Sequence, residues 1–200
     1  METINNIKEF SSIKSILPLV IDLNNEIPNQ IFVKANHFVF IEFLEVSTKN
    51  FFNSIISLKK TEFIFYSIVP DPEKYYFPHF SKFNVFKFNF RDSSIDYLKL
   101  IHEKPNETSA DAIMDIVDKF VVFSKDLEIV IYGDRDFDLM ILGFDDLNQK
   151  LRFISEFGEN RIFSLNDIQD LILSNYPNKY DFIEKIKSNF FSFNNGEESV

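Results

Sequence analysis

The sequence predicts an α+β fold in a single domain, with a central, mostly antiparallel β-sheet of about six strands packed by N-terminal and C-terminal helices. Short runs rich in Phe, Ile and Val indicate the strands, and three of these runs follow one another with tight polar connections. Apolar residues at helical spacing occur near both ends of the chain. A length of 200 residues fits one core. We therefore expect one domain over residues 1–192 and a disordered tail over residues 193–200.

The first third of the chain is predicted to hold a helix and then a strand–helix–strand unit. Residues 4–16 place Ile and Phe three positions apart, which is typical of an amphipathic helix. Residues 36–46 are apolar on both faces of an extended chain, which predicts a central strand. A capped helix over 47–60 and a second apolar strand over 62–69 follow. A parallel pair of strands would result from this unit.

The middle of the chain alternates between loops and short elements. Residues 70–80, "PDPEKYYFPHF", are rich in Pro and predict a loop, and residues 104–115 predict another. Between them, residues 82–90 favour a strand and residues 93–103 a short capped helix.

The second half is predicted to complete the sheet and then to end in helices. Ser164 followed by Asp167 indicates a capping box at the start of one of these helices. The predicted elements are a meander of strands at 119–126, 127–134 and 137–144, then helices at 145–157, 164–176 and 179–191. Phe40, Ile64 and Ile131 are expected to be buried on central strands.

The composition excludes several classes of protein. There is no Cys, so disulfides and thiolate metal sites are excluded. The 4 Gly cannot form a G-x-G-x-x-G or Walker loop, and the 3 His lack the spacing of zinc-binding helices. No signal peptide is evident at the N-terminus, and no apolar run reaches the length of a membrane span. We therefore expect a cytoplasmic protein without cofactor or metal.

The acidic residues are concentrated in the second half of the chain. Residues 1–100 hold 11 acids and 11 bases, whereas residues 101–200 hold 20 acids and 10 bases and so carry the whole formal net charge of −10. Within residues 103–146 there are 12 acids and 4 bases. Such a surface repels nucleic acid and anionic membranes and attracts a basic protein partner. The alternative is a solvated acidic surface that only keeps the protein in solution.

The segment "IVIYGDRDFDLMILGF", residues 129–144, carries alternating aspartates. Acids at 134, 136, 138 and 145 have the spacing of a calcium loop, but Leu139 stands where the sharp turn needs Gly. A strand corner fits better, with Gly133 supplying the turn and Asp136 and Asp138 sharing one face of the following strand. Two carboxylates on one face require a cation nearby, which Arg135, a metal or a partner's Lys or Arg would supply.

The candidate partner-binding residues are therefore acidic or aromatic. Tyr75 and Tyr76 lie in the Pro-rich loop, and Tyr is favoured in interfaces. The alternative for these rings is that they cover an edge of the sheet. The candidate set is Asp134, Arg135, Asp136, Asp138, Asp111, Asp115, Asp118, Tyr75 and Tyr76.

The run "FSKDLEIVIYGDRDFDLMILGF", residues 123–144, resembles a pattern in small cytoplasmic bacterial proteins of the toxin-immunity type, in which a "YGDR" corner joins two strands. The resemblance implies a one-domain α+β protein that blocks a toxin by binding it, and it carries over no catalytic residues. Two other functions stay open. One is a metal-dependent hydrolase that uses Asp134, Asp136 and Asp138, and the other is a regulatory adaptor with no toxin partner.

Overall fold

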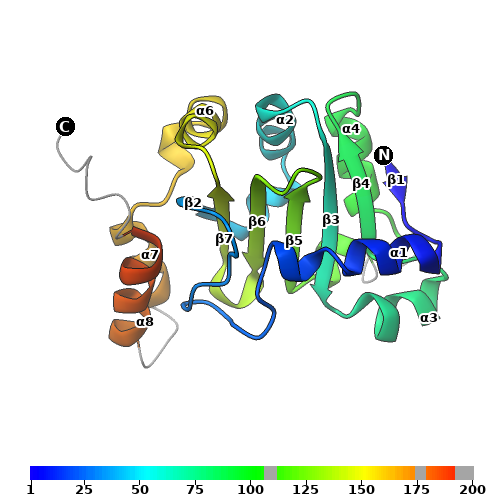
Figure 1. Cartoon of the computed structure of the whole chain (residues 1–200), viewed down its shortest axis with the longest axis horizontal. Helices are drawn as coiled ribbons and strands as arrows, with labels where there is room; N and C mark the ends of the chain where they lie inside the picture. Colours follow the sequence, from blue (N-terminus) through cyan, green and yellow to red (C-terminus); the bar gives the residue numbers. More distant parts are fainter. Residues whose placement is uncertain (106–111, 174–178, 192–200) are drawn as a thin grey trace.

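The fold is α+β and is built on one antiparallel sheet (Figure 1). The computed structural model describes residues 1–105, 112–173 and 179–191. Asp111 and the expected tail at 193–200 lie outside these ranges. In the described part of the chain the sheet has seven strands in the order β1-β4-β3-β5-β6-β7-β2, and each neighbouring pair is antiparallel. The strands are β1 (Glu2–Thr3), β2 (His37–Glu42), β3 (Glu62–Val69), β4 (Val85–Asn89), β5 (Lys119–Ser124), β6 (Ile129–Asp134) and β7 (Leu139–Phe144).

The expected meander and the expected core are confirmed. Strands β5, β6 and β7 are neighbours in the sheet, joined by short corners as predicted. Phe40, Ile64 and Ile131 are 2%, 4% and 0% exposed. Their burial follows from apolar residues on both faces of each strand, which is the pattern of a sheet covered on both sides.

The expected parallel pair at 36–69 is wrong. Strand β2 lies at an edge of the sheet, where it pairs with β7 alone, and β5, β6 and β7 separate it from β3. Counting the antiparallel pairings across the sheet shows that β2 and β3 run in the same direction without touching. The meander fills the space between them, because short hairpin connections form neighbouring strands most readily.

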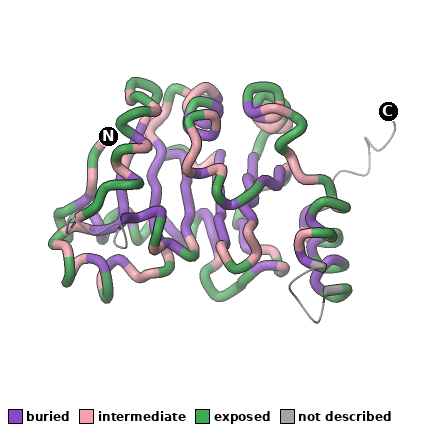
Figure 2. The backbone as a smooth tube through the Cα atoms, turned by 180° about the vertical axis from the view of Figure 1, so that it is seen from behind, coloured by how far each residue is buried: buried purple, intermediate pink, exposed green. Residues whose placement is uncertain are grey.

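Helices cover both faces of the sheet, so that two apolar layers form. One layer receives side chains from α2 (Lys49–Leu58), α4 (Ser94–Ile101) and α6 (Leu147–Phe157). The other receives them from α1 (Ile7–Lys14), α7 (Leu165–Leu173) and α8 (Lys179–Ile186). Figure 1 shows α1 crossing in front of the strands and α7 and α8 beside β2. In Figure 2, seen from behind, the buried backbone follows the strands and the exposed backbone follows the outer helices.

Several helices begin where the sequence places a capping residue. Thr48 accepts a hydrogen bond from the Phe51 N–H at the start of α2, and Ser93 does the same for Asp96 at the start of α4. At α7 the predicted capping box is present, because Ser164 accepts from the Asp167 N–H and Asp167 accepts from the Ser164 N–H. These local bonds satisfy backbone donors that have no partner within the helix.

The segment at 70–80 is helical rather than an open loop. A wide helical turn spans Pro72–Tyr76 and continues as α3 (Phe77–Phe80). The Tyr76 ring packs 4.6 Å from the Phe80 ring, and the Phe77 ring stacks 4.5 Å from that of Phe83. Asp71 caps the turn by accepting from two backbone N–H groups. Aromatic packing and this cap stabilise the turn, and Pro72 and Pro78 lie in first turns, where proline is tolerated.

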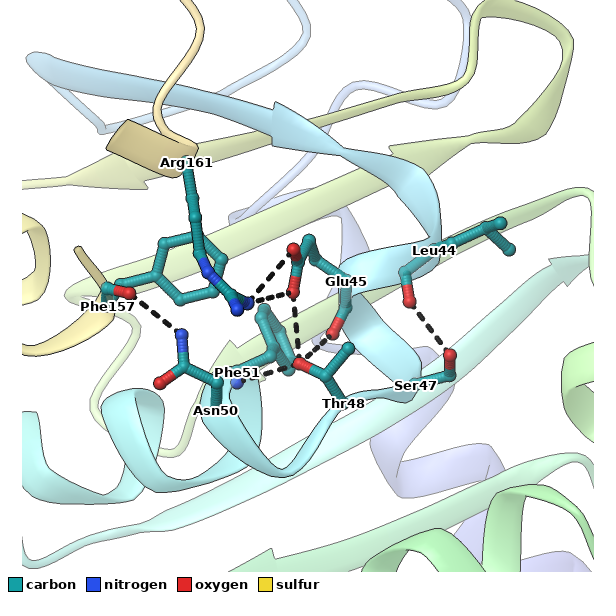
Figure 3. A network of polar contacts seen from close by, with 8 residues as sticks. All are labelled: Leu44, Glu45, Ser47, Thr48, Asn50, Phe51, Phe157 and Arg161. Carbon is teal, nitrogen blue, oxygen red and sulfur yellow. Dashed lines mark hydrogen bonds and ion pairs between the residues drawn. The ribbon is translucent and has the colours of Figure 1, made fainter. Parts of the chain in front are cut away.

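The outer edge of β2 is covered by the chain that follows α6. The Phe163 N–H donates to the Phe40 carbonyl over 2.8 Å, and the Phe40 ring stacks 5.1 Å from that of Phe191. Figure 3 shows how this chain is fixed: Arg161 bonds both carboxylate oxygens of Glu45 at 3.2 Å, and Asn50 donates to the Phe157 carbonyl. The bond to Phe40 occupies one carbonyl of this edge strand, which another chain could otherwise pair with.

Gly133 is required inside β6, not at the turn expected from the sequence. A Cβ at this position would lie 2.3 Å from Cε1 of Phe120, whose ring is held between those of Phe43 and Phe65. We expect Gly133→Ala to lower the free energy of unfolding by about 1–3 kcal/mol, because an extra carbon in a filled core forces its neighbours apart. Urea unfolding measures this loss. Adding Phe120→Leu should restore part of it, and an unchanged midpoint in Gly133→Ala would show that the ring can move freely.

Candidate functional site

The aspartate corner at residues 134–138 is a tight turn and not the start of a strand. Strand β6 ends at Asp134, Arg135–Phe137 form one turn of 3-10 helix, and β7 begins at Leu139. The Asp134 carboxylate accepts from the Asp136 N–H over 3.1 Å. Asp138 has a φ of 52°, a left-handed conformation that Asp adopts more readily than most residues. The expected strand face shared by Asp136 and Asp138 therefore does not exist, because the turn rotates them apart.

Asp134 lies inside the protein. It is 0% exposed, accepts a hydrogen bond from the Tyr132 hydroxyl over 3.1 Å, and lies 3.4 Å from the Lys119 ammonium. Lys119 is its direct cross-strand neighbour and also pairs with Glu26 at 3.0 Å. Burial raises the pKa of the Asp134 carboxyl, although the attraction of Lys119 opposes this rise. The expectation that Asp134 projects toward a partner is wrong, because its side chain points into the protein and bonds the Tyr132 hydroxyl and the Asp136 N–H.

The pH dependence of stability should reveal this buried carboxyl. A carboxyl with a raised pKa binds its proton more tightly in the folded chain, so folding loses stability as the pH rises from the ordinary value of 3.8 through the raised one. Asp134→Asn keeps an acceptor for Tyr132 and carries no charge. Relative to wild type, we expect this variant to gain stability over that pH interval and to be at least as stable at neutral pH.

Urea unfolding at a series of pH values measures this difference. The matched control is Asp118→Asn, which removes one charge from the same end of the sheet, but from a side chain that is 52% exposed. If Asp134→Asn instead loses stability relative to wild type as the pH rises, the attraction of Lys119 lowers the pKa of Asp134 by more than burial raises it.

Arg135 points toward its own chain and stabilises the corner. Its Nε donates to the Val117 carbonyl over 2.8 Å and its Nη2 to the Met114 carbonyl over 2.6 Å. The guanidinium also lies 5.0 Å from the centre of the Phe43 ring. These contacts attach the short helix α5 (Ile113–Ile116) to the end of the sheet. Arg135 is therefore an internal clamp, which leaves its charge only partly exposed to a partner.

Acids from distant parts of the sequence meet at this end of the sheet. The pairing register places Val69, Lys119, Asp134, Leu139 and Glu42 in one row across five strands. The chain leaves or enters the sheet at each of these positions, so the neighbouring acids lie along the same rim. We define the acidic end as the carboxylates of Glu42, Asp115, Asp118, Asp136 and Asp138, all exposed except for Asp138, which is half-buried.

The acidic end includes one residue that the sequence did not single out for binding. Glu42 is the last residue of an apolar strand, and that position alone is the signal that could have placed it at a sheet end. Glu26 approaches the same rim through its ion pair with Lys119. Lys119 in this row pairs with Asp134 and Glu26. Arg135 at the corner bonds two backbone carbonyls and lies 3.5 Å from the Asp118 carboxylate, so it offsets one of the five acids, and the charge of the acidic end stays negative.

The two candidate tyrosines have different environments. Tyr76 is 1% exposed and packs inside against the Phe80 ring, so the expectation that it contacts a partner is wrong. Tyr75 is 40% exposed and its ring lies 4.9 Å from that of His79. Tyr75 belongs to the segment that follows β3, and this segment begins at the acidic end of the sheet. Tyr75 is thus the one of the pair that a partner can reach.

The carboxylates of the aspartate corner do not surround a common point. Across the described ranges, no group of three or more His, Cys, Asp or Glu side chains is placed to hold a metal ion. Asp134 in particular is enclosed by Tyr132, Lys119 and the backbone. Asp134, Asp136 and Asp138 therefore do not form such a group.

Comparisons with known proteins give no relative for this chain. No protein-family model, no curated protein and no solved structure matches it. Among the described residues, no helix is both long and apolar enough to cross a membrane.

Proposed function

We propose that this chain is a non-enzymatic binding protein of the immunity type, which neutralises a basic toxin by direct binding through the acidic end. The observation that carries the proposal is the convergence of Glu42, Asp115, Asp118, Asp136 and Asp138 on one rim of the sheet. Exposed charges of one sign on a rigid support increase the rate at which an oppositely charged protein docks. They also specify the partner, because like charges would be repelled.

The acidic end has a rigid support. The acidic end rests on paired strands, on the Arg135 clamp and on the buried Asp134, so the carboxylates are held before a partner arrives. A preformed surface loses little conformational entropy on binding, which improves affinity. Tyr75 adds an exposed aromatic side chain on a segment that starts from the same end.

A growth assay with a captured partner tests the proposal. The tagged protein is used to isolate its partner from the native host, and the partner is then produced alone in a laboratory strain. We expect a basic protein whose production arrests growth, and we expect co-production of this chain to restore growth. The proposal fails if the partner is acidic, if its production is harmless, or if growth stays arrested although the complex forms.

A further inference from the structure

Arg135 places a positive charge among the carboxylates of the acidic end. Its guanidinium lies 3.5 Å from the Asp118 carboxylate, and it shares one turn of 3-10 helix with Asp136. The Arg135 side chain is 35% exposed, so part of its charge faces an approaching protein. A cation at this position weakens the attraction of the acidic end for a basic partner. Electrostatic attraction alone therefore gives no reason for an arginine here.

Four of the five carboxylates of the acidic end lie on two separate parts of the chain. One part is the segment at 112–118, which includes α5 and carries Asp115 and Asp118. The other part is the turn between β6 and β7, which carries Asp136 and Asp138. A partner that pairs with both parts needs them in a fixed relative position.

The segment at 112–118 has little regular structure of its own. Its helix α5 has four residues, far fewer than a helix needs to be stable alone. Ala112 at the N-cap has no polar side chain to accept from the first N–H groups. Ile113, Met114 and Val117 are buried in the core, and they attach the segment to the protein. Such apolar contacts are not directional, so they do not by themselves fix where the exposed aspartates lie.

The Arg135 side chain supplies directed contacts to this segment. Its Nη2 donates to the Met114 carbonyl over 2.6 Å and its Nε to the Val117 carbonyl over 2.8 Å. Carbonyls at the end of a helix have no partner within it, and a planar group with two donors orients both of them together. The Arg135 N–H also donates to the Asp118 carbonyl over 2.8 Å. One residue of the turn thus holds the segment at three backbone positions.

We propose that Arg135 is a positioning residue, which holds the segment at 112–118 against the turn so that a basic partner meets both pairs of aspartates at once. This inference rests on the proposed function and deepens it, because it names the residue on which the geometry of the acidic end depends. Carboxylates that are already in place bind without a loss of conformational entropy, which offsets the attraction lost to one positive charge. Removing that charge should therefore weaken binding, whereas attraction by charge alone would strengthen it.

Amide hydrogen exchange of the full chain tests the positioning without a partner. Arg135→Gln removes both the charge and the planar pair of donors. We expect the amides of Val117 and Asp118 to exchange about tenfold faster, because a segment that is held less firmly opens more often. The amides of Val130 and Ile131 in β6 are the internal reference and should keep their wild-type rates. Equal acceleration at both places would show a loss of overall stability and would overturn the inference.

Two further variants separate the shape of the side chain from its charge. Arg135→Lys keeps the charge but loses the planar pair of donors, so it should also accelerate exchange in the segment. Arg91→Gln removes one positive charge at the opposite end of the sheet, since β4 ends at Asn89, which pairs with Glu62 at the start of β3. Exchange in the segment should be unchanged in Arg91→Gln.

Binding to the partner captured for the growth assay tests the role in recognition. We expect Arg135→Gln to bind this partner about tenfold more weakly than wild type, mainly through faster dissociation, although its net charge is more negative by one. Arg91→Gln has the same net charge and should bind at least as tightly as wild type. Tighter binding by Arg135→Gln would show that charge alone controls affinity, and would overturn the inference.

A double-mutant cycle measures the coupling between Arg135 and the aspartates that it positions. Asp115→Asn with Asp118→Asn should weaken binding in the wild-type chain. In the Arg135→Gln chain the same two changes should have a much smaller effect, because the aspartates no longer have a fixed place in the complex. Equal effects in both chains would show that Arg135 and these aspartates act independently, which contradicts the inference.

The outcomes distinguish this inference from the proposed function. If exchange in the segment is unchanged in Arg135→Gln, the buried side chains hold the segment and the inference is wrong, while the growth assay still decides the proposed function. If exchange accelerates but affinity does not change, Arg135 only stabilises the fold, and the proposed function stands without it. If the captured partner is acidic or harmless, the proposed function fails, and the inference fails with it.

Discussion

Phe65→Ala is expected to lower the free energy of unfolding by about 3–5 kcal/mol, the range for truncating a buried aromatic ring. Phe65 is fully enclosed on β3, and its ring stacks on two others, 4.8 Å from Phe86 and 5.0 Å from Phe120. Truncation leaves a cavity in the core. It also removes both ring contacts, and the loss of these contacts lowers the free energy of unfolding further. A reduction of this size is a large fraction of the stability of an ordinary domain.

Chemical denaturation followed by circular dichroism measures this effect. The control is Phe90→Ala, because Phe90 is partly exposed just after β4 and its loss should cost much less. If Phe65→Ala unfolds at the wild-type denaturant concentration, the ring stack is not a source of stability, and the layer between the sheet and α2, α4 and α6 is packed differently.

Neutralising Asp115, Asp118 and Asp136 together, each as Asn, is expected to slow association with the captured partner by about tenfold at low salt. The electrostatic attraction that speeds association comes from the summed field of the exposed acids. Salt screens this field over a distance of about 8–10 Å. The variant should therefore also show a shallower dependence of the association rate on salt. All three side chains are exposed, so its melting temperature should be close to that of wild type.

Stopped-flow association at low and high salt measures both effects. The matched control changes three other exposed acids, Asp145→Asn, Glu156→Gln and Glu159→Gln, so that the net charge is the same in both variants. Asp145 follows the end of β7 that is opposite the acidic end, and the two glutamates lie at the end of α6 and just after it. Equal rates in the two variants would show that total charge, and not its position, controls association.

Much of the local structure could be predicted because it depends on residues close together in the sequence. The caps at Thr48, Ser93 and Ser164 act within three residues. The meander required only apolar runs separated by short polar corners. The sequence also located the aspartate corner, because its residues are close together in the chain. It did not predict the conformation of the corner, which depends on the hydrogen bond that the Asp134 side chain accepts and on the left-handed backbone of Asp138.

The candidate site could be predicted only in part. The sequence indicated where the acids are concentrated, and Asp115, Asp118, Asp136 and Asp138 do come together. It could not show that Asp134 faces inward, because that depends on Lys119 being its cross-strand neighbour and on Tyr132 reaching its carboxylate. Nor could it show that Tyr76 is buried while the adjacent Tyr75 is exposed.

The sequence by itself therefore determined the kinds of element, most of their positions and the sign of the charge on the second half of the chain. Only the tertiary structure decided that β2 lies at an edge of the sheet, separated from β3 by three strands, and that Glu42 joins the acids of residues 115–138. The physical reason is that propensity, capping and turn formation act over a few residues. The order of strands depends instead on contacts between distant segments, which form only when the whole apolar surface is buried together.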